Sequence, residues 1–186
     1  MLMYSSCPLN TAIYSCRVPG KKKMSAVADG ASPRSPRVST SDPPVSSKNA
    51  FVRPLLTDLY QITMCYAYWK SGRHESEATF DIFFRKNPFG GEYTVFAGLS
   101  EVLLFIDKWR LTDDDIAYLR EVMLPHAEPE FFAYLQALDC SEVRVHGVHE
   151  GSVVFPREPL MRIEGPLGIC QLLETTILNL TNLRRS

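Results

Sequence analysis

Residues 54–72 read PLLTDLYQITMCYAYWKSG and mark the start of the folded part of this chain. One face of the segment is apolar at helical spacing and consists of Leu59, Ile62, Tyr66 and Trp69. The opposite face is apolar too and consists of Tyr60, Met64, Ala67 and Tyr68. Pro54 and Thr57 precede this run, and Gly72 is placed to end it. A helix with two apolar faces is buried on both sides, so the second face is predicted to meet the rest of the fold or a partner subunit.

The next segment, ATFDIFFRKNPFGGEYTVFA at residues 78–97, changes to a period of two. Its apolar residues at even positions alternate with Thr79, Asp81, Phe83 and Arg85, a pattern that predicts a strand. NPFGG then supplies a turn before a second run at residues 93–97, so the segment is predicted to be a β-hairpin. The loop at residues 87–91, next to Arg85 and Lys86, could seat a phosphate or be a plain hairpin turn.

Three helices are predicted between residues 100 and 138. Ser100 can cap the first helix, and Thr112 with Asp115 forms a capping-box pattern at the start of the second. Pro129 opens the third helix at the first helical position, where proline is favoured. The acidic run at residues 113–115 is explained by the helix dipole, so a helix start is favoured there over a metal site.

After residue 139 the pattern returns to short strands, in VRVHGVHEG, SVVF and LMRIEG. A last helix is predicted over residues 167–180, with an apolar face of Ile169, Leu172, Leu173, Ile177 and Leu180. The order is helix, hairpin, helices, strands and helix, which predicts an α+β fold.

The first fifty residues differ from the rest in composition and charge. They hold seven Lys and Arg against two Asp, a net charge of +5, which leaves 13 minus 19, or −6, for residues 51–186. Residues 25–49 are rich in Ser and Pro and lack large aromatic side chains, so residues 1–50 are predicted to be a disordered basic tail. The acidic balance of residues 51–186 argues against a nucleic-acid partner.

The chain shows no apolar run that approaches the ~20 residues of a membrane span, so no membrane association is predicted. Its five cysteines are scattered and form no CxxC pair, which argues against a disulfide framework and against a zinc site. A reducing compartment, the cytosol, fits this pattern best.

Known catalytic motifs are absent from the sequence, which has no Walker loop, no GxGxxG and no GxSxG. His146 and His149 are three positions apart, a spacing that puts them on opposite faces of a strand. Joint metal binding by these two residues would need a bend at Gly147, and no third ligand is evident. Residue types alone therefore indicate an α+β domain. The aromatic-rich surface of its first helix resembles that of a helix at a protein interface.

Four segments, in order, resemble the N-terminal part of nicotinate phosphoribosyltransferases. They are TDLYQITMCYAYW, TFDIFFRKNPFGG, EYTVFAGLSEVLLFI and EGSVVFPREPLMRIEGPLGICQLLETTILNL. The resemblance covers about residues 51–180 and implies the α+β N-terminal domain of a type II phosphoribosyltransferase. Enzymes of this family join nicotinate to phosphoribosyl pyrophosphate to give nicotinate mononucleotide and pyrophosphate, with coupled ATP hydrolysis, in NAD salvage. The resemblance also implies Mg²⁺ with the ATP, and a head-to-tail homodimer that builds each active site from two subunits.

Three residues carry the site that the resemblance implies. Tyr60 matches the tyrosine of an Asp-x-Tyr motif that stacks on the pyridine ring in the partner subunit's site, a role that suits a rigid aromatic side chain. Asp58 matches the aspartate of that motif and is expected to support the ring. Arg85 matches an arginine that reaches a substrate phosphate across the dimer in related nicotinamide enzymes. The alternatives are a helix N-terminal acid for Asp58, a core residue for Tyr60 and a solvated strand end for Arg85.

The sequence departs from the family after residue 180. In the family the chain continues into an irregular α/β barrel that holds a histidine phosphorylated by ATP, whereas this sequence ends at NLTNLRRS, so residues 181–186 are read as a divergent end. None of the four histidines matches that residue, and no catalytic residue is assigned. We therefore expect a truncated form without turnover of its own, or alternatively a non-catalytic dimerisation fragment that modulates the full-length enzyme.

Overall fold

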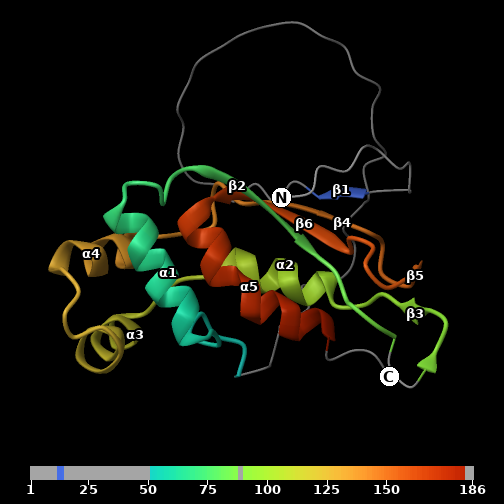
Figure 1. Ribbon diagram of the computed structural model, residues 1–186, viewed down its shortest axis with the longest axis horizontal. Helices are drawn as coiled ribbons and strands as arrows, with labels where there is room; N and C mark the ends of the chain where they lie inside the picture. Colours follow the sequence, from blue (N-terminus) through green and yellow to red (C-terminus); the bar gives the residue numbers. More distant parts are fainter. Residues whose placement is uncertain (1–11, 15–50, 88–89, 183–186) are drawn as a thin grey trace, which may run out of the picture.

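The fold is a layer of helices packed on an antiparallel sheet (Figure 1). A computed structural model describes residues 12–14, 51–87 and 90–182. Its helices are α1 Leu59–Lys70, α2 Leu99–Lys108, α3 Asp113–Tyr118, the π-helical turn η2 Leu119–Met123, α4 Pro129–Ala137 and α5 Leu167–Asn182. Its strands are β1 Ala12–Tyr14, β2 Glu77–Ile82, β3 Thr94–Val95, β4 Arg144–Gly147, β5 Val153–Val154 and β6 Met161–Pro166. This order confirms the predicted α+β class.

The main sheet has the strand order β1-β4-β6-β2, and β6 is one of its two inner strands. It pairs along its whole length with β2, from Glu77 opposite Pro166 to Ile82 opposite Met161. Its other edge pairs with β4, and β4 pairs with β1. Strand β1 was not expected, because it lies within the predicted tail. The rest of that tail, like residues 183–186, lies outside the described residues.

The predicted hairpin at residues 78–97 is wrong. Strand β2 pairs with β6, and the two-residue β3 pairs with β5 in a separate sheet. The alternation itself is confirmed, because Ile82 and Phe84 are buried whereas Thr79 and Asp81 are exposed. Residues 83–93 form too long a connection to impose the register of a tight hairpin, so the longer strand β6 becomes the partner of β2.

Helix α5 covers one face of the sheet, and α1 and α2 pack against α5 (Figure 1). The predicted apolar face of α5 is buried as expected. The other face of the sheet is charged, and Arg144 joins Glu77 at 2.6 Å while Arg162 joins Asp81 at 2.8 Å. None of the described helices has both the length and the apolar character needed to cross a membrane.

Helix starts test the capping predictions directly. Thr112 and Asp115 exchange the two hydrogen bonds of a capping box, and Pro129 is the first residue of α4, as predicted. The prediction that Ser100 caps α2 is wrong, because the capping position is Gly98, with φ +107°. A Cβ at Gly98 would lie 2.7 Å from the Leu180 carbonyl oxygen, so only glycine fits there. The first turn of α2 is bound instead by Glu150, which accepts from the Gly98 and Ser100 amides.

Candidate functional site

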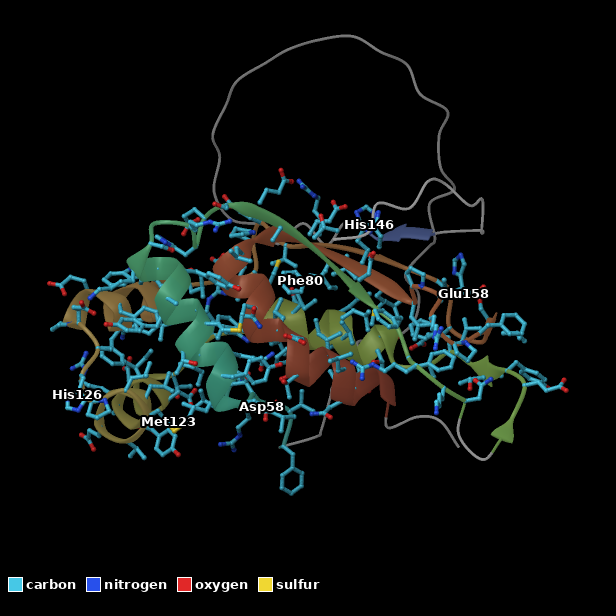
Figure 2. All side chains as sticks on the ribbon, in the orientation of Figure 1. Asp58, Phe80, Met123, His126, His146 and Glu158 are labelled. Atoms are coloured by element: carbon cyan, nitrogen blue, oxygen red, sulfur yellow. The ribbon has the colours of Figure 1, made fainter. Side chains whose placement is uncertain are left out.

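Asp58 is the residue that starts helix α1. It has extended backbone angles, and its amide donates to Gln61 Oε1 at 3.2 Å. Its carboxylate also accepts a hydrogen bond of 3.1 Å from the Thr175 hydroxyl in the middle of α5. Asp58 therefore does begin a helix, as one of the two readings predicted, and it also joins this helix start to α5 (Figure 2).

Tyr60 lies in the first turn of α1 and is 47% exposed, so the reading of Tyr60 as a core residue is wrong. Partial burial and the negative charge of Glu174 on α5 raise the pKa of Tyr60. The phenol is therefore protonated at neutral pH and can donate a hydrogen bond.

Two buried glutamines complete this region, and the sequence analysis missed both. Gln61 is fully buried and Gln171 is 3% exposed. Both side-chain amides donate to Glu174 Oε2, Gln61 at 3.3 Å and Gln171 at 3.0 Å. We call Asp58, Tyr60, Gln61, Gln171, Glu174 and Thr175 the α1–α5 cluster. In the sequence, this cluster is visible only as polar residues within two apolar helices. The sequence does not show that these residues contact one another.

A groove of about 510 Å³ lies beside this cluster, between α5 and the end of β2. Its apolar lining includes Phe80, Phe84 and Leu173, and Figure 2 shows Phe80 between β2 and the helices. Arg85, which sequence analysis selected, lines the same groove together with Lys86 and Glu174. Glu174 thus belongs both to the groove and to the α1–α5 cluster.

Arg85 and Lys86 are both exposed. Within residues 51–87 and 90–182, neither side chain makes a hydrogen bond or an ion pair. Two adjacent cations at a groove can bind an anionic group such as a phosphate. The alternative reading of Arg85 as a solvated strand end describes the same geometry in the absence of a ligand. The loop at 87–91 lies partly outside the described residues.

The second apolar face of α1 is open to solvent. Tyr60 is 47% exposed and Met64 is 37% exposed, and Ala67 is exposed as well. Leu59, on the first apolar face, is 50% exposed. The prediction that Leu59 faces inward is wrong, because the buried side of the helix is turned toward Ile62 and Cys65. This rotation follows from the burial of Gln61 against Glu174, which apolar periodicity cannot reveal.

The two histidines that were considered as metal ligands lie elsewhere. His146 is on the charged face of the sheet, away from the helices (Figure 2), with Nε2 3.4 Å from Glu164 Oε2. The part of the chain that the structure describes holds no group of three or more His, Cys, Asp or Glu side chains able to bind a metal ion. Cys65, Cys140 and Cys170 are buried, and burial raises the pKa of the Cys170 thiol to about 12.

Comparison with known proteins gives one consistent result. Residues 55–182 match the nicotinate phosphoribosyltransferase (NAPRTase) N-terminal domain. The nicotinate phosphoribosyltransferase of Caenorhabditis elegans is 54% identical over 138 residues, which are 74% of this chain and 25% of that protein. Nicotinate phosphoribosyltransferase 2 of Arabidopsis thaliana is 59% identical over 134 residues, which are 72% of this chain and 24% of that protein.

A solved structure agrees with the sequence matches. The crystal structure of human nicotinic acid phosphoribosyltransferase has a TM-score of 0.63 and 48% identity, and the match covers 67% of this chain and 25% of that chain. This chain spans about a quarter of the length of these relatives. The domain match covers more than half of the chain and includes Asp58, Tyr60 and Arg85, and on this basis the chain belongs to the nicotinate phosphoribosyltransferase family.

Proposed function

We propose that this chain supplies the N-terminal part of a nicotinate phosphoribosyltransferase active site. The reaction joins nicotinate to phosphoribosyl pyrophosphate, coupled to ATP hydrolysis, and yields nicotinate mononucleotide and pyrophosphate for NAD salvage. The observation that carries the proposal is that the Tyr60 ring is about half exposed to solvent. It lies at the start of α1, which the hydrogen bond between Asp58 and Thr175 connects to α5. A buried core residue would not leave such a ring accessible.

Each residue has a role in this proposal. The Tyr60 ring stacks on the pyridine ring of nicotinate, because aromatic faces associate favourably in offset geometry. Asp58 orients the helix start that carries Tyr60. Arg85 binds a substrate phosphate at the groove, and an exposed guanidinium that has no partner among the described residues suits this role.

A partner subunit follows from the same surface. Leu59, Tyr60 and Met64 form an exposed apolar strip on α1, and apolar side chains gathered on one helix face are typical of interfaces. We propose that this strip packs in a head-to-tail homodimer, in which Tyr60 enters the site of the other subunit. The isolated chain of 186 residues is then without turnover, because the rest of the site belongs to the three quarters of the relatives' length that it does not span.

ATP and Mg²⁺ are not assigned to residues of this chain. The described residues offer no cluster of three carboxylates, imidazoles or thiols for a metal ion. No step of the proposal passes through the ion.

A complementation assay tests the proposal. The residue of the Caenorhabditis elegans relative that aligns with Tyr60 is replaced by alanine, and this protein is co-expressed with the present chain. We expect a mixed complex in size-exclusion chromatography and restored formation of nicotinate mononucleotide. The Tyr60→Ala chain is the matched control, and it should form the complex without restoring turnover.

Each other outcome is informative. A mixed complex without restored turnover would contradict the role of Tyr60 and favour the second candidate, a dimerisation fragment that modulates a complete enzyme; the exposed strip on α1 supports that candidate as well. The absence of any mixed complex would contradict both functions. Nicotinate mononucleotide formed by the purified chain alone would contradict the expected lack of turnover.

A further inference from the structure

We infer that the outer edge of strand β2 binds an extended segment of another protein, which adds one strand to the main sheet. The segment has apolar side chains at every second position and acidic residues at its N-terminal end, where it meets Arg85 and Lys86. This inference goes beyond the proposed function and does not depend on it, because it concerns a binding surface of this chain alone.

The first support is the backbone of β2, which is paired on one side. Strand β2 is the last strand of the main sheet, and its one described partner is β6. The carbonyls of Ile82 and Phe84 accept hydrogen bonds of 2.7 Å each on that side, from the segment that leads into β6. Backbone groups alternate in direction along a strand, so those of Asp81 and Phe83 point to the opposite side, where no other described strand lies. Such an edge is a template for one more strand.

The second support is the groove beside this strand. Residues 80–86, which are consecutive, all line it. If the groove bordered only one face of the strand, every second residue would line it, so the backbone edge itself borders the groove. Helix α5 forms the other wall with Cys170, Leu173, Ile177 and Leu178. A peptide that pairs with β2 can therefore place every second side chain against apolar residues of α5.

The third support is the charge of the groove, which indicates the chemistry of the segment. Its two carboxylates already have partners, because Asp81 binds Arg162 at 2.8 Å and Glu174 accepts from two buried glutamines. Arg85 and Lys86 are exposed and have no ion pair within the described residues. The charge that is left without a partner is thus positive and favours acidic residues in the segment. Both cations follow β2, so a segment in the more common antiparallel orientation meets them with its N-terminal end.

A second copy of the chain and a phosphate ligand are the alternative occupants. The apolar side chains of a second β2 are already used in its own core, since Ile82 and Phe84 are 5% and 4% exposed, and they cannot fill the groove of another copy. A phosphate uses only Arg85 and Lys86 and leaves the edge of β2 unpaired. An extended peptide uses the edge, the apolar wall and the two cations together.

A binding assay with this chain alone tests the inference. The probe is a fluorescein-labelled peptide that begins with two aspartates and continues with alternating valine and threonine, and fluorescence anisotropy measures its Kd. We expect the double variant Arg85→Ala, Lys86→Ala to weaken binding about tenfold, because charge-assisted hydrogen bonds are lost. Lys108→Ala, which changes an exposed lysine of α2 that does not line the groove, is the matched control and should leave Kd unchanged.

Phe83→Pro tests the edge itself. Proline removes one amide on the outer side of the strand and leaves the hydrogen bonds toward β6 in place. We expect it to weaken binding about tenfold relative to Phe83→Ala, which removes the same ring and keeps the amide. A probe that is N-methylated at every second residue should lose binding for the same reason, and this arm needs no change in the chain.

The remaining outcomes would overturn the inference. If the methylated and unmethylated probes bound equally, only the charges would attract the peptide, and no strand would be added. If the unmethylated probe did not bind the wild-type chain, the edge would not accept this kind of segment. A dimer of the free chain that Phe83→Pro dissociates would identify a second copy as the occupant. The complementation assay decides the proposed function separately, so its failure would leave these peptide measurements unaffected.

Discussion

The two ends of helix α1 are held in different ways. At the C-terminal end, Tyr66 and Trp69 pack on Phe131 of α4, with ring centroids 5.0 and 5.6 Å apart. At the N-terminal end, Leu59 and Tyr60 are about half exposed, and polar contacts with α5 replace aromatic packing. Aromatic packing therefore holds the C-terminal end of α1, whereas directed hydrogen bonds hold its N-terminal end.

This difference shows how one helix can serve stability and function at the same time. Apolar packing is strong but does not orient a single exposed side chain, whereas hydrogen bonds contribute less free energy but fix direction. The packed end anchors α1, so the other end can leave an aromatic ring in solvent without loss of the helix. Substitutions at the two ends should therefore have very different effects on the free energy of unfolding.

Phe131→Ala should have the largest effect. Phe131 is fully buried and contacts both aromatic residues of α1, so we expect a loss of about 3–5 kcal/mol in the free energy of unfolding. Urea unfolding followed by circular dichroism measures this loss. Leu59→Ala at the other end of α1 is the control, with an expected change within about 0.5 kcal/mol. Equal effects of the two substitutions would contradict the difference between the two ends.

Gly168→Ala should have the next largest effect. A Cβ at Gly168, in the first turn of α5, would overlap the Tyr134 hydroxyl and lie 3.4 Å from His74 Cβ, just beyond the packed end of α1. The clash outweighs the better helix propensity of alanine, so we expect the free energy of unfolding to fall by about 1–3 kcal/mol. Thermal unfolding measures this loss.

Tyr134→Phe sharpens this second prediction. The buried Tyr134 hydroxyl has no hydrogen-bond partner among the described residues, so its removal alone should cost little. The double variant Gly168→Ala, Tyr134→Phe should recover most of the loss, because the overlapping oxygen is gone. Strict additivity of the two changes would show that the hydroxyl is not the obstacle.

The packed end was largely predictable from sequence, whereas the polar end was not. Apolar periodicity identified Tyr66 and Trp69 on the inner face of α1, and it identified the buried face of α5 as well. Such patterns depend on local sequence and on the general preference of apolar side chains for the core. Resemblance to the family selected Asp58, Tyr60 and Arg85, of which Asp58 contacts α5 and Arg85 lines the groove beside it.

The contacts that could not be predicted join specific pairs of residues or strands that are distant in the sequence. Gln61 meets Glu174 across 113 positions of sequence, and this contact turns the helix so that Leu59 faces outward. The partner of β2 was missed for the same reason, since β6 is distant in the sequence and the nearer run at residues 93–97 looked equally suitable. Periodicity reports that a face is buried but does not identify its partner.

Glu128 gives a smaller effect that depends on pH. Hydrogen bonds from Lys70 and Tyr66 lower the pKa of this carboxyl from 4.5 to about 2. Because the pKa in the folded state lies below that of the unfolded chain, the contact stabilises the protein above about pH 4.5, and this contribution is lost as the pH falls toward 2. The difference in melting temperature between the wild type and Glu128→Gln should therefore shrink over this interval.

The control for this pH effect is Glu130→Gln, an exposed glutamate in the first turn of α4, two positions after Glu128. Its difference from the wild type should stay nearly constant between pH 7 and pH 2. If the difference in melting temperature between Glu128→Gln and the wild type also stayed constant, it would contradict the contact of the Glu128 carboxylate with Lys70 and Tyr66.

Tyr60→Phe should have the smallest effect on stability. The substitution removes only a hydroxyl from an exposed ring, so we expect the free energy of unfolding to change by less than about 0.5 kcal/mol. The ring remains available for stacking, so KM for nicotinate in the mixed complex should stay within about twofold of the wild type. A large loss of stability in Tyr60→Phe would show that the polar end of α1 is an anchor like the packed end, and the division of roles along this helix would fail.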